Sequence, residues 1–287
     1  MKIILFPTLF LGSLVAAQAQ STITAWTFEN NSIAVNNSPA PSTGSGSASS
    51  IGMNTYPTPN IGVTSDDVVL GKSADTGANT VANLTQTWRI RGQAGSSGAA
   101  NGWSSAAPIG SQGAVFAAST AGFNNINVSF DWYATTQGEA NLQLQYTTDG
   151  STWNNIAISL SGSDSGLQVV SYNGADGLTV SGSYVRDNLL INGTPAGQGW
   201  FTGLTASISD PNAANDSNFA IQLVNASTGA DCVSTAGTAL NNTSGNWRFD
   251  NVVISGTAIA PVPEPSTLAL GGLGLAAIGF FRRNRKA

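Results

Sequence analysis

Histidine is absent from this 287-residue chain, and cysteine occurs once, as Cys232. Without histidine the chain lacks the commonest general base, the usual zinc ligand and any Ser-His-Asp triad. A single cysteine forms no intramolecular disulfide, so a secreted fold has to be held by its core or by bound ions. A thiol nucleophile without histidine beside it is poorly activated. We therefore interpret Cys232 as a buried or incidental residue.

Basic residues are scarce in the body of the chain, residues 20–260. This stretch holds five basic and fourteen acidic residues, a net charge of −9. The basic residues are Lys72, Arg89, Arg91, Arg186 and Arg248. Binding to a phosphate backbone requires clustered Lys and Arg, so nucleic acid is excluded as a partner. Neutral polysaccharide, divalent cations and proteins remain.

The first twenty residues, "MKIILFPTLFLGSLVAAQAQ", have the organisation of a secretory signal. Lys2 precedes an apolar run, and Ala17 and Ala19 form an A-x-A pattern. We predict a signal peptide over residues 1–19 that is cut after Ala19. A buried N-terminal helix is the alternative, but the shortness of the run and its lone cation favour the signal.

The chain ends with "VPEPSTLALGGLGLAAIGFFRRNRKA", which combines an apolar run with a basic terminus. The run from Pro265 to Phe281 has seventeen uncharged residues. As a helix it would rise about 25 Å, against a hydrocarbon core of about 30 Å, so the predicted transmembrane segment in residues 266–287 is marginal. Positive flanks stay on the cytoplasmic side, which places the body outside. The flanking cations are Arg282, Arg283, Arg285 and Lys286.

The order of these features resembles the PEP-CTERM sorting signal of Gram-negative bacteria. Val262-Pro263-Glu264-Pro265 comes first, and the apolar run and the Arg-rich end follow within the last 26 residues. The resemblance implies that exosortase, a membrane-embedded cysteine protease, recognises the Pro-Glu-Pro motif and removes the anchor. The protein would reside briefly in the inner membrane and then reach the cell surface or the extracellular polysaccharide. An ordinary single-pass anchor with a proline-rich stalk is the alternative.

The body shows a two-residue periodicity rather than a helical one. Four apolar residues of "NINVSFDWYA" share one face: Ile126, Val128, Phe130 and Trp132. The same alternation occurs in "NLQLQYTTDG" and "LTQTWRIRG", as is typical of half-buried antiparallel strands. Further strands are expected at Thr22–Glu29, Gln112–Ala118, Thr152–Leu160, Gly166–Ser171, Phe201–Ser209, Asn218–Asn225 and Asn246–Ser255.

Many short strands with turn residues between them predict an all-β fold. We expect one antiparallel β-sandwich, a jelly roll, over residues 20–256, with a stalk at 257–265. The segments "NNSPAPSTGSGSASS" and "RGQAGSSGAANGWSSAAPIG" are poor in core residues, so we expect them to be long surface loops.

Two segments of the body suggest a metal site. "AWTFENN" and "WRFDNVVIS" each place an aromatic residue directly before an acid, Glu29 and Asp250. They resemble the first and last strands of jelly-roll carbohydrate-binding modules of the galactose-binding type. That resemblance implies that Glu29 and Asp250 share a structural Ca²⁺, an ion that takes six to eight oxygen ligands. Solvated strand ends are the alternative.

The alternation changes phase within the second segment. Trp247 and Phe249 share one parity, whereas Val252 and Ile254 share the other. A β-bulge near Asp250 would turn all four side chains to the same face.

A third segment, "YTTDGSTWNNI", resembles half of an Asp-box. Asp149 is adjacent to Gly150, however, whereas an Asp-box separates these residues by one, and the segment occurs once. An Asp-Gly hairpin turn accounts for it without a ligand.

Sugar binding and sugar hydrolysis have separate candidates. Trp103, Trp153 and Trp200 lie in or beside polar loops, where a tryptophan either stacks on a sugar ring or covers the edge of the core. Asp131 and Glu139 lie near strand ends and are the carboxylates that a glycoside hydrolase would need at a defined separation. Most acids occur singly in turns, so we expect no enzyme. We predict a structural or adhesive component of the cell surface or biofilm matrix. The alternatives are a carbohydrate-binding module and, less favoured, a polysaccharide-degrading enzyme.

Overall fold

A computed structural model of the chain describes fifteen segments, together covering most of the body. They are residues 19–31, 38–52, 67–70, 86–91, 102–135, 137–159, 167–173, 179–187, 190–191, 194–195, 200–235, 237–242, 245–260, 271–272 and 274–275. The predicted signal peptide, residues 1–19, lies outside these segments except for Ala19, and so do the Pro-Glu-Pro motif and the basic terminus. Residues 271–272 and 274–275 are helical.

The first sheet has β17 (Asn246–Ala258) at its centre. Its strand order is β14-β7-β17-β4-β3, and β1 also pairs with β17, all antiparallel. The strands are β14 (Trp200–Ser207), β7 (Phe123–Ala134), β4 (Gln86–Arg91), β3 (Asp67–Leu70) and β1 (Gln20–Trp26). Along one side β17 pairs with β7. Along the other side it pairs with β4 near its beginning and with β1 near its end.

The second sheet has the order β10-β11-β8-β15-β6-β2, with β9 paired to β8. Its strands are β10 (Leu167–Asn173), β11 (Thr179–Asp187), β8 (Asn141–Thr147), β15 (Ala220–Asn225), β6 (Gly113–Ala117), β2 (Ser47–Ile51) and β9 (Asn154–Ile156). Two small two-stranded sheets pair β5 (Trp103–Ser104) with β16 (Asn241–Asn242) and β12 (Leu190–Ile191) with β13 (Thr194–Pro195).

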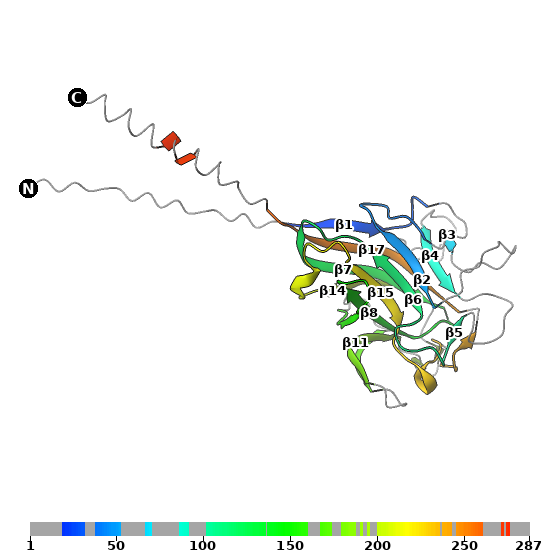
Figure 1. Cartoon of the computed structure of the whole chain (residues 1–287). Helices are drawn as coiled ribbons and strands as arrows, with labels where there is room; N and C mark the ends of the chain where they lie inside the picture. Colours follow the sequence, from blue (N-terminus) through cyan, green and yellow to red (C-terminus); the bar gives the residue numbers. More distant parts are fainter. Residues whose placement is uncertain are drawn as a thin grey trace, which may run out of the picture.

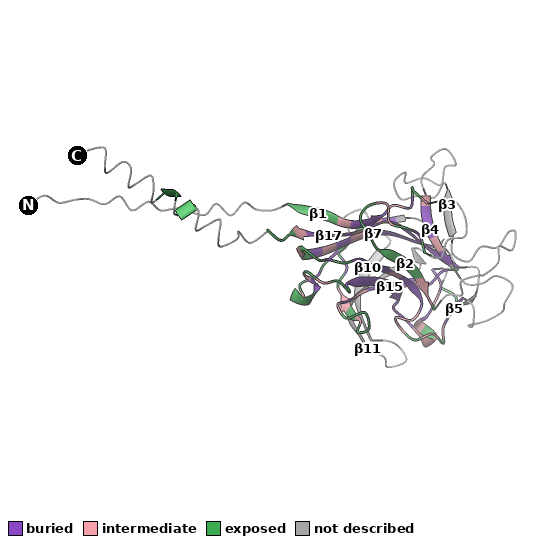
Figure 2. Ribbon diagram, turned by 45° about the horizontal axis from the view of Figure 1, so that its top comes forward, coloured by how far each residue is buried: buried purple, intermediate pink, exposed green. Residues whose placement is uncertain are grey.

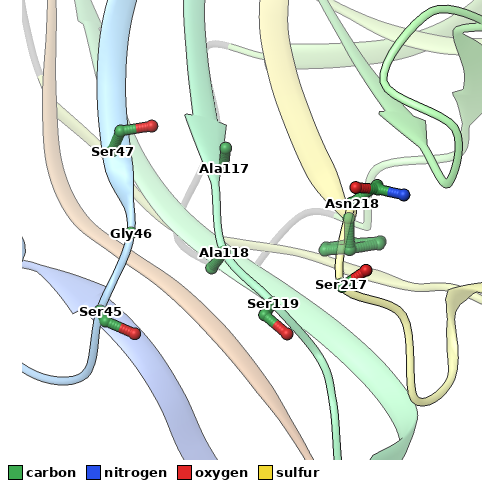
Figure 3. Close-up of a pocket in the computed structure, with 9 residues that line it drawn as sticks. Ser45, Gly46, Ser47, Ala117, Ala118, Ser119, Ser217 and Asn218 are labelled. Carbon is green, nitrogen blue, oxygen red and sulfur yellow. The ribbon is translucent and has the colours of Figure 1, made fainter.

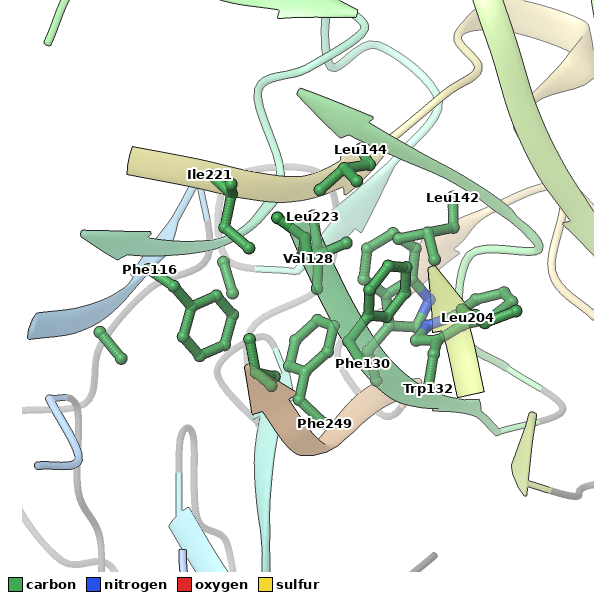
Figure 4. Packing of buried hydrophobic residues seen from close by; sticks show 14 of the residues in the cluster. Phe116, Val128, Phe130, Trp132, Leu142, Leu144, Leu204, Ile221, Leu223 and Phe249 are labelled. Atoms are coloured by element: carbon green, nitrogen blue, oxygen red, sulfur yellow. The ribbon is translucent and has the colours of Figure 1, made fainter. Parts of the chain in front are cut away.

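The core lies between the two sheets and is rich in aromatic side chains (Figure 4). Phe116 of β6 contacts Trp26 of β1, Trp88 of β4 and Phe249 of β17, at ring-centroid distances of 5.2, 5.8 and 5.8 Å. Edge-to-face packing of this kind adds to the free energy gained from buried apolar area. Figure 2 shows that β7, β15 and β17 are largely buried, whereas β1 and β2 are partly exposed. The core thus stabilises a fold that has no disulfide.

The chain crosses repeatedly between the two sheets. It passes from β6 in the second sheet to β7 in the first and to β8 in the second, and again from β14 to β15 to β17. Such crossings are typical of a jelly roll. Within the described part, helical structure in the body is limited to the short η2 (Pro211–Ala213) and η3 (Gly229–Asp231). The predicted all-β sandwich is confirmed.

The two segments expected to be surface loops contain strands. Ser47–Ile51 form β2, which pairs with β6 in the register Ser47↔Ala117. Trp103 of β5 is fully buried. The expectation failed because Ser and Ala have weak strand propensity, whereas packing decides here: Ala48 is 1% exposed and lies in the core cluster.

The two ends of the body lie side by side. Gln20 of β1 pairs with Thr257 of β17, and Figure 1 shows β1 beside the end of β17. The last strand runs to Ala258, so the first two residues of the expected stalk belong to the sheet. Over the segments described, we find no helix of the length and apolarity needed to cross a membrane.

Candidate functional site

The C-terminal end of β17 is the place where the body meets the tail. Thr257 and Ala258 pair with Asn124 and Phe123 of β7. One residue further on, the N–H of Ile259 donates to the carbonyl oxygen of Gly122 at 2.8 Å. The chain is therefore held by hydrogen bonds up to Ile259.

The predicted bulge is present in β17. The register between β17 and β7 shifts between Asp250 and Val253, and Asn251 has a φ of 48°. Asn tolerates this left-handed conformation better than most residues. As a result Phe249, Val252 and Ile254 are all fully buried, although their sequence parity differs.

Asp131 of β7 connects this bulge to a second one. It lies directly opposite Asp250 in the ladder. Its Oδ2 accepts from Nδ2 of Asn251 at 2.9 Å, and its Oδ1 accepts from the N–H of Gly203 at 2.6 Å. Gly203 has a φ of 69° and lies in a register shift of β14. The sequence analysis did not predict this second bulge, although the lone glycine in "WFTGLTAS" could have indicated it, since Gly inside a strand often marks a bulge.

The two predicted calcium ligands have different surroundings. Glu29 is exposed, and its Oε1 accepts from the N–H of Gln86 at 2.7 Å. Asp250 is fully buried, and its Oδ1 accepts from the N–H of Asn251 at 2.8 Å. Among the described residues, no three Asp, Glu, Cys or His side chains lie close enough together to hold a metal ion. Calcium at Glu29 and Asp250 stays a prediction.

Glu139 is the centre of a buried polar cluster. Its Oε1 accepts from the N–H and Nδ2 of Asn141, at 3.1 and 2.9 Å, and from Oγ of Ser227 at 2.7 Å. Its Oε2 accepts from Sγ of Cys232 at 3.0 Å, so the prediction of a buried Cys232 is confirmed. Burial raises the pKa of Glu139 to about 7, although these hydrogen bonds oppose the shift.

Neither candidate for carboxylate catalysis reaches solvent readily. Glu139 is 0% exposed and Asp131 is 7% exposed. Both carboxylates accept hydrogen bonds from the fold, at Ser227 and Gly203 among others. A glycosidase needs its two carboxyl groups on either side of a bound sugar. The burial of these two gives polysaccharide hydrolysis no support.

The three tryptophans considered as sugar-binding residues differ in what the structure shows of them. Trp103 is fully buried, donates from Nε1 to the carbonyl oxygen of Gly245 at 3.0 Å and lies 4.6 Å from the ring of Trp247. It covers the core and presents no face to a sugar. Trp153 is partly buried. Trp200 begins β14, and its side chain lies outside the described part.

The Asp-Gly turn is confirmed as a hairpin connection between β8 and β9. Oδ1 of Asp149 accepts from the N–H groups of Ser151 and Thr152, at 2.8 and 2.6 Å, and Gly150 has a φ of 75°. These bonds, above all the one from Thr152, hold the pKa of the exposed Asp149 well below its usual range. The segment therefore has a local structural explanation.

The surface clefts are small and are lined by both polar and apolar residues. One of about 250 Å³ lies beyond the ends of β2 and β6 (Figure 3), where Ser45, Ser119 and Ser217 contribute hydroxyl groups. Gly46 lines it, and a Cβ there would lie 2.4 Å from the carbonyl oxygen of Ala117. A second cleft, of about 300 Å³, is lined by residues 124–126, 208–211 and 214, next to the end of β17. Neither cleft has an exposed aromatic platform among its lining residues.

Comparison with known proteins identifies the tail. The family described as the PEP-CTERM protein-sorting motif matches residues 261–286. The chain thus carries the sorting signal of an exported exosortase substrate, as the sequence predicted. No curated protein and no solved structure is significantly similar to the chain.

Proposed function

We propose that the body is a structural or adhesive component of the cell surface or the extracellular matrix, delivered there when exosortase removes the tail. The observation that carries this proposal is the PEP-CTERM motif at residues 261–286, which begins three residues after β17 ends at Ala258. The body is a folded unit attached to the sorting signal by a very short connection. Cutting that connection would release the whole sandwich.

The buried polar groups support a role without catalysis. Glu139 and Asp131 hold parts of the fold together, and Trp103 packs into the core. The chain has no histidine to act as a general base. Extracellular polysaccharide remains a proposed partner, and a carbohydrate-binding module with a defined glycan is the second possibility.

Sorting is tested by replacing Pro263, Glu264 and Pro265 together with alanine. We expect the variant to stay in the inner membrane with its anchor uncut, whereas the wild type reaches the surface. Mass spectrometry of the surface protein identifies the C-terminal peptide. Ala260→Ser, which alters the chain next to the motif, is the control and should be sorted normally. Recovery of a peptide ending in Ala287 from the surface form of the wild type would show that the anchor is not removed.

The role of the body is tested on the surface form purified from its host. Co-sedimentation with the polysaccharide of the same host supports the matrix role. A glycan array that gives one strong ligand would favour the binding module instead. Release of reducing sugar from the polysaccharide would contradict the proposal.

A further inference from the structure

The point at which the tail leaves the body is fixed by hydrogen bonds on both sides of β17. Thr257 pairs with Gln20 of β1 and with Asn124 of β7. Ile259 is bonded to Gly122. Further back, Val252 and Ile254 are fully buried, so β17 cannot be drawn out of the sheet without exposing the core. The tail therefore starts at Ile259.

Only three residues separate this fixed point from the Pro-Glu-Pro residues of the sorting signal. Ala260, Pro261 and Val262 lie between Ile259 and Pro263. Four Cα–Cα steps of an extended chain span at most about 14 Å. The Pro-Glu-Pro residues are therefore joined to the folded body by a chain that spans at most about 14 Å.

The other side of the motif is the membrane. The apolar run continues directly from Pro265, so a tail inserted in the bilayer would leave the motif at the membrane surface. A membrane-embedded protease has to bring its active site into the space between the bilayer and the body. One α-helix with its side chains is about 10–12 Å wide. The available space is therefore close to the width of a single structural element of the enzyme.

The surface of the body that faces this space is neutral to acidic. Residues 119–125 and 209–216, which surround the end of β17, contain Asp210 and Asp216 and no Lys or Arg. Their other polar side chains are amides and hydroxyls. Because bacterial phospholipid surfaces are commonly anionic, such a surface is not drawn onto the bilayer by charge. The space next to the motif is not closed by electrostatic attraction.

We propose that the length of the spacer Ala260–Val262, measured from Ile259, determines whether exosortase can cut this chain. The inference rests on the proposed processing by exosortase. The body acts as a fixed obstacle, and the spacer is close to the shortest that lets the protease reach Pro263–Pro265. Its length matters, whereas the identity of Ala260, which precedes the matched residues 261–286, does not.

A length series in the full chain, expressed in its host, tests this inference. Deletion of Ala260 keeps the hydrogen bond of Ile259 to Gly122 and the matched residues 261–286, and shortens the spacer by one residue, about 3.5 Å. We expect a severalfold loss of the cleaved form. Ala260→Ser keeps the length and should leave cleavage unchanged. Insertion of Gly-Ser-Gly-Ser-Gly-Ser after Ala260 should also leave it unchanged.

A second substitution distinguishes length from sequence. Thr257→Pro in the deletion variant removes a backbone N–H from the last rungs of the sheet and should free them. The freed residues lengthen the spacer, so cleavage should recover. Cleavage of the deletion variant at the wild-type rate, or failure of the proline to restore it, would overturn the inference. Replacing Pro263, Glu264 and Pro265 with alanine should block cleavage in every variant of the length series. If cleavage persists, the proposed processing by exosortase is itself wrong.

Discussion

Glu139 is a fully buried acid whose protonation should affect the stability of the whole body. Its pKa is raised from 4.5 to about 7 by burial. In the unfolded chain the acid ionises near its ordinary pKa, whereas the folded form retains its proton until about pH 7. The folded state is therefore favoured most below about pH 4.5, and this contribution is lost as pH rises toward 7.

We expect the free energy of unfolding to fall by up to about 3 kcal/mol between about pH 5 and about pH 8, at about 1.4 kcal/mol for each pKa unit. Urea unfolding of the surface form at the two pH values measures it. Glu139→Gln keeps the shape and cannot ionise, so its stability should be nearly flat over this range. Glu29→Gln, at an exposed acid, is the control and should keep the wild-type slope. A wild type equally stable at both pH values would contradict the prediction.

Asp131 holds two bulges with one carboxylate. Asp131→Ala removes the acceptor for Gly203 and for Asn251. Hydrogen bonds to charged groups contribute about 1.5–3 kcal/mol each, so we expect a loss of about 3 kcal/mol or more. Asp131→Asn retains one acceptor oxygen and should lose less. Urea unfolding checks both; an alanine variant within experimental error of the wild type would show that the bulges do not depend on this residue.

Individual residues were predictable to different extents. Cys232 was interpreted as buried or incidental because a lone cysteine without histidine is poorly suited to catalysis, and the structure shows that it is buried. The partners of Glu139 could not be predicted, because Ser227 and Cys232 are 88 and 93 positions away along the chain. Only the fold brings them to one carboxylate.

At the level of strands, the alternation of apolar and polar residues was the pattern that predicted structure. It predicted the inward face of β7, and the change of phase between Phe249 and Val252 predicted the bulge in β17. It failed for β2, whose Ser and Ala residues show little hydrophobic contrast. It also did not indicate that Asp131 would lie opposite Asp250, because register depends on which strands pair.

Calcium binding is a prediction about how the strands are joined, since Glu29 follows β1 and Asp250 lies in β17. Free Ca²⁺ at about 100 times its Kd should add about 2.7 kcal/mol and raise Tm by several degrees. Mg²⁺ should do less, because it demands stricter octahedral geometry. Thermal unfolding with Ca²⁺ and with chelator measures the difference.

Asp250 is buried, so Asp250→Asn can lower Tm without any ion. The informative quantity is therefore the difference in Tm between Ca²⁺ and chelator, which Glu29→Gln and Asp250→Asn should each reduce. A wild-type Tm that is the same in both conditions would leave the two acids with the structural roles described above.

For the whole molecule, the position of the two ends matters most. The sequence predicted a segment for removal at each end, but it could not show that Gln20 and Thr257 are neighbours. Their pairing brings the predicted cleavage point after Ala19 and the end of β17 to the same end of the sandwich. With the tail anchored as proposed, this end of the body would face the membrane.

The charge of the body predicts how it behaves once the tail is removed. Residues 20–260 carry a net charge of −9. The segments around the end of β17, residues 119–125 and 209–216, contain no Lys or Arg. Attraction of a protein to anionic lipid requires clustered Lys and Arg at about 1 kcal/mol each. The four cations of the terminus are separated from the body when the tail is cut.

We therefore expect the cleaved surface form to remain unbound when mixed with phosphatidylglycerol vesicles. The variant with alanine at Pro263, Glu264 and Pro265, which keeps its tail, should float with the vesicles. Flotation at low and at high salt distinguishes the two modes of binding. Insertion of the apolar tail should resist salt, whereas attraction to lipid charge weakens as the Debye length falls. If the surface form floats at low salt and is released at high salt, the body has a basic surface that its charge pattern does not predict. In that case the space between body and bilayer would be closed by attraction, and the dependence of cleavage on spacer length would need another cause.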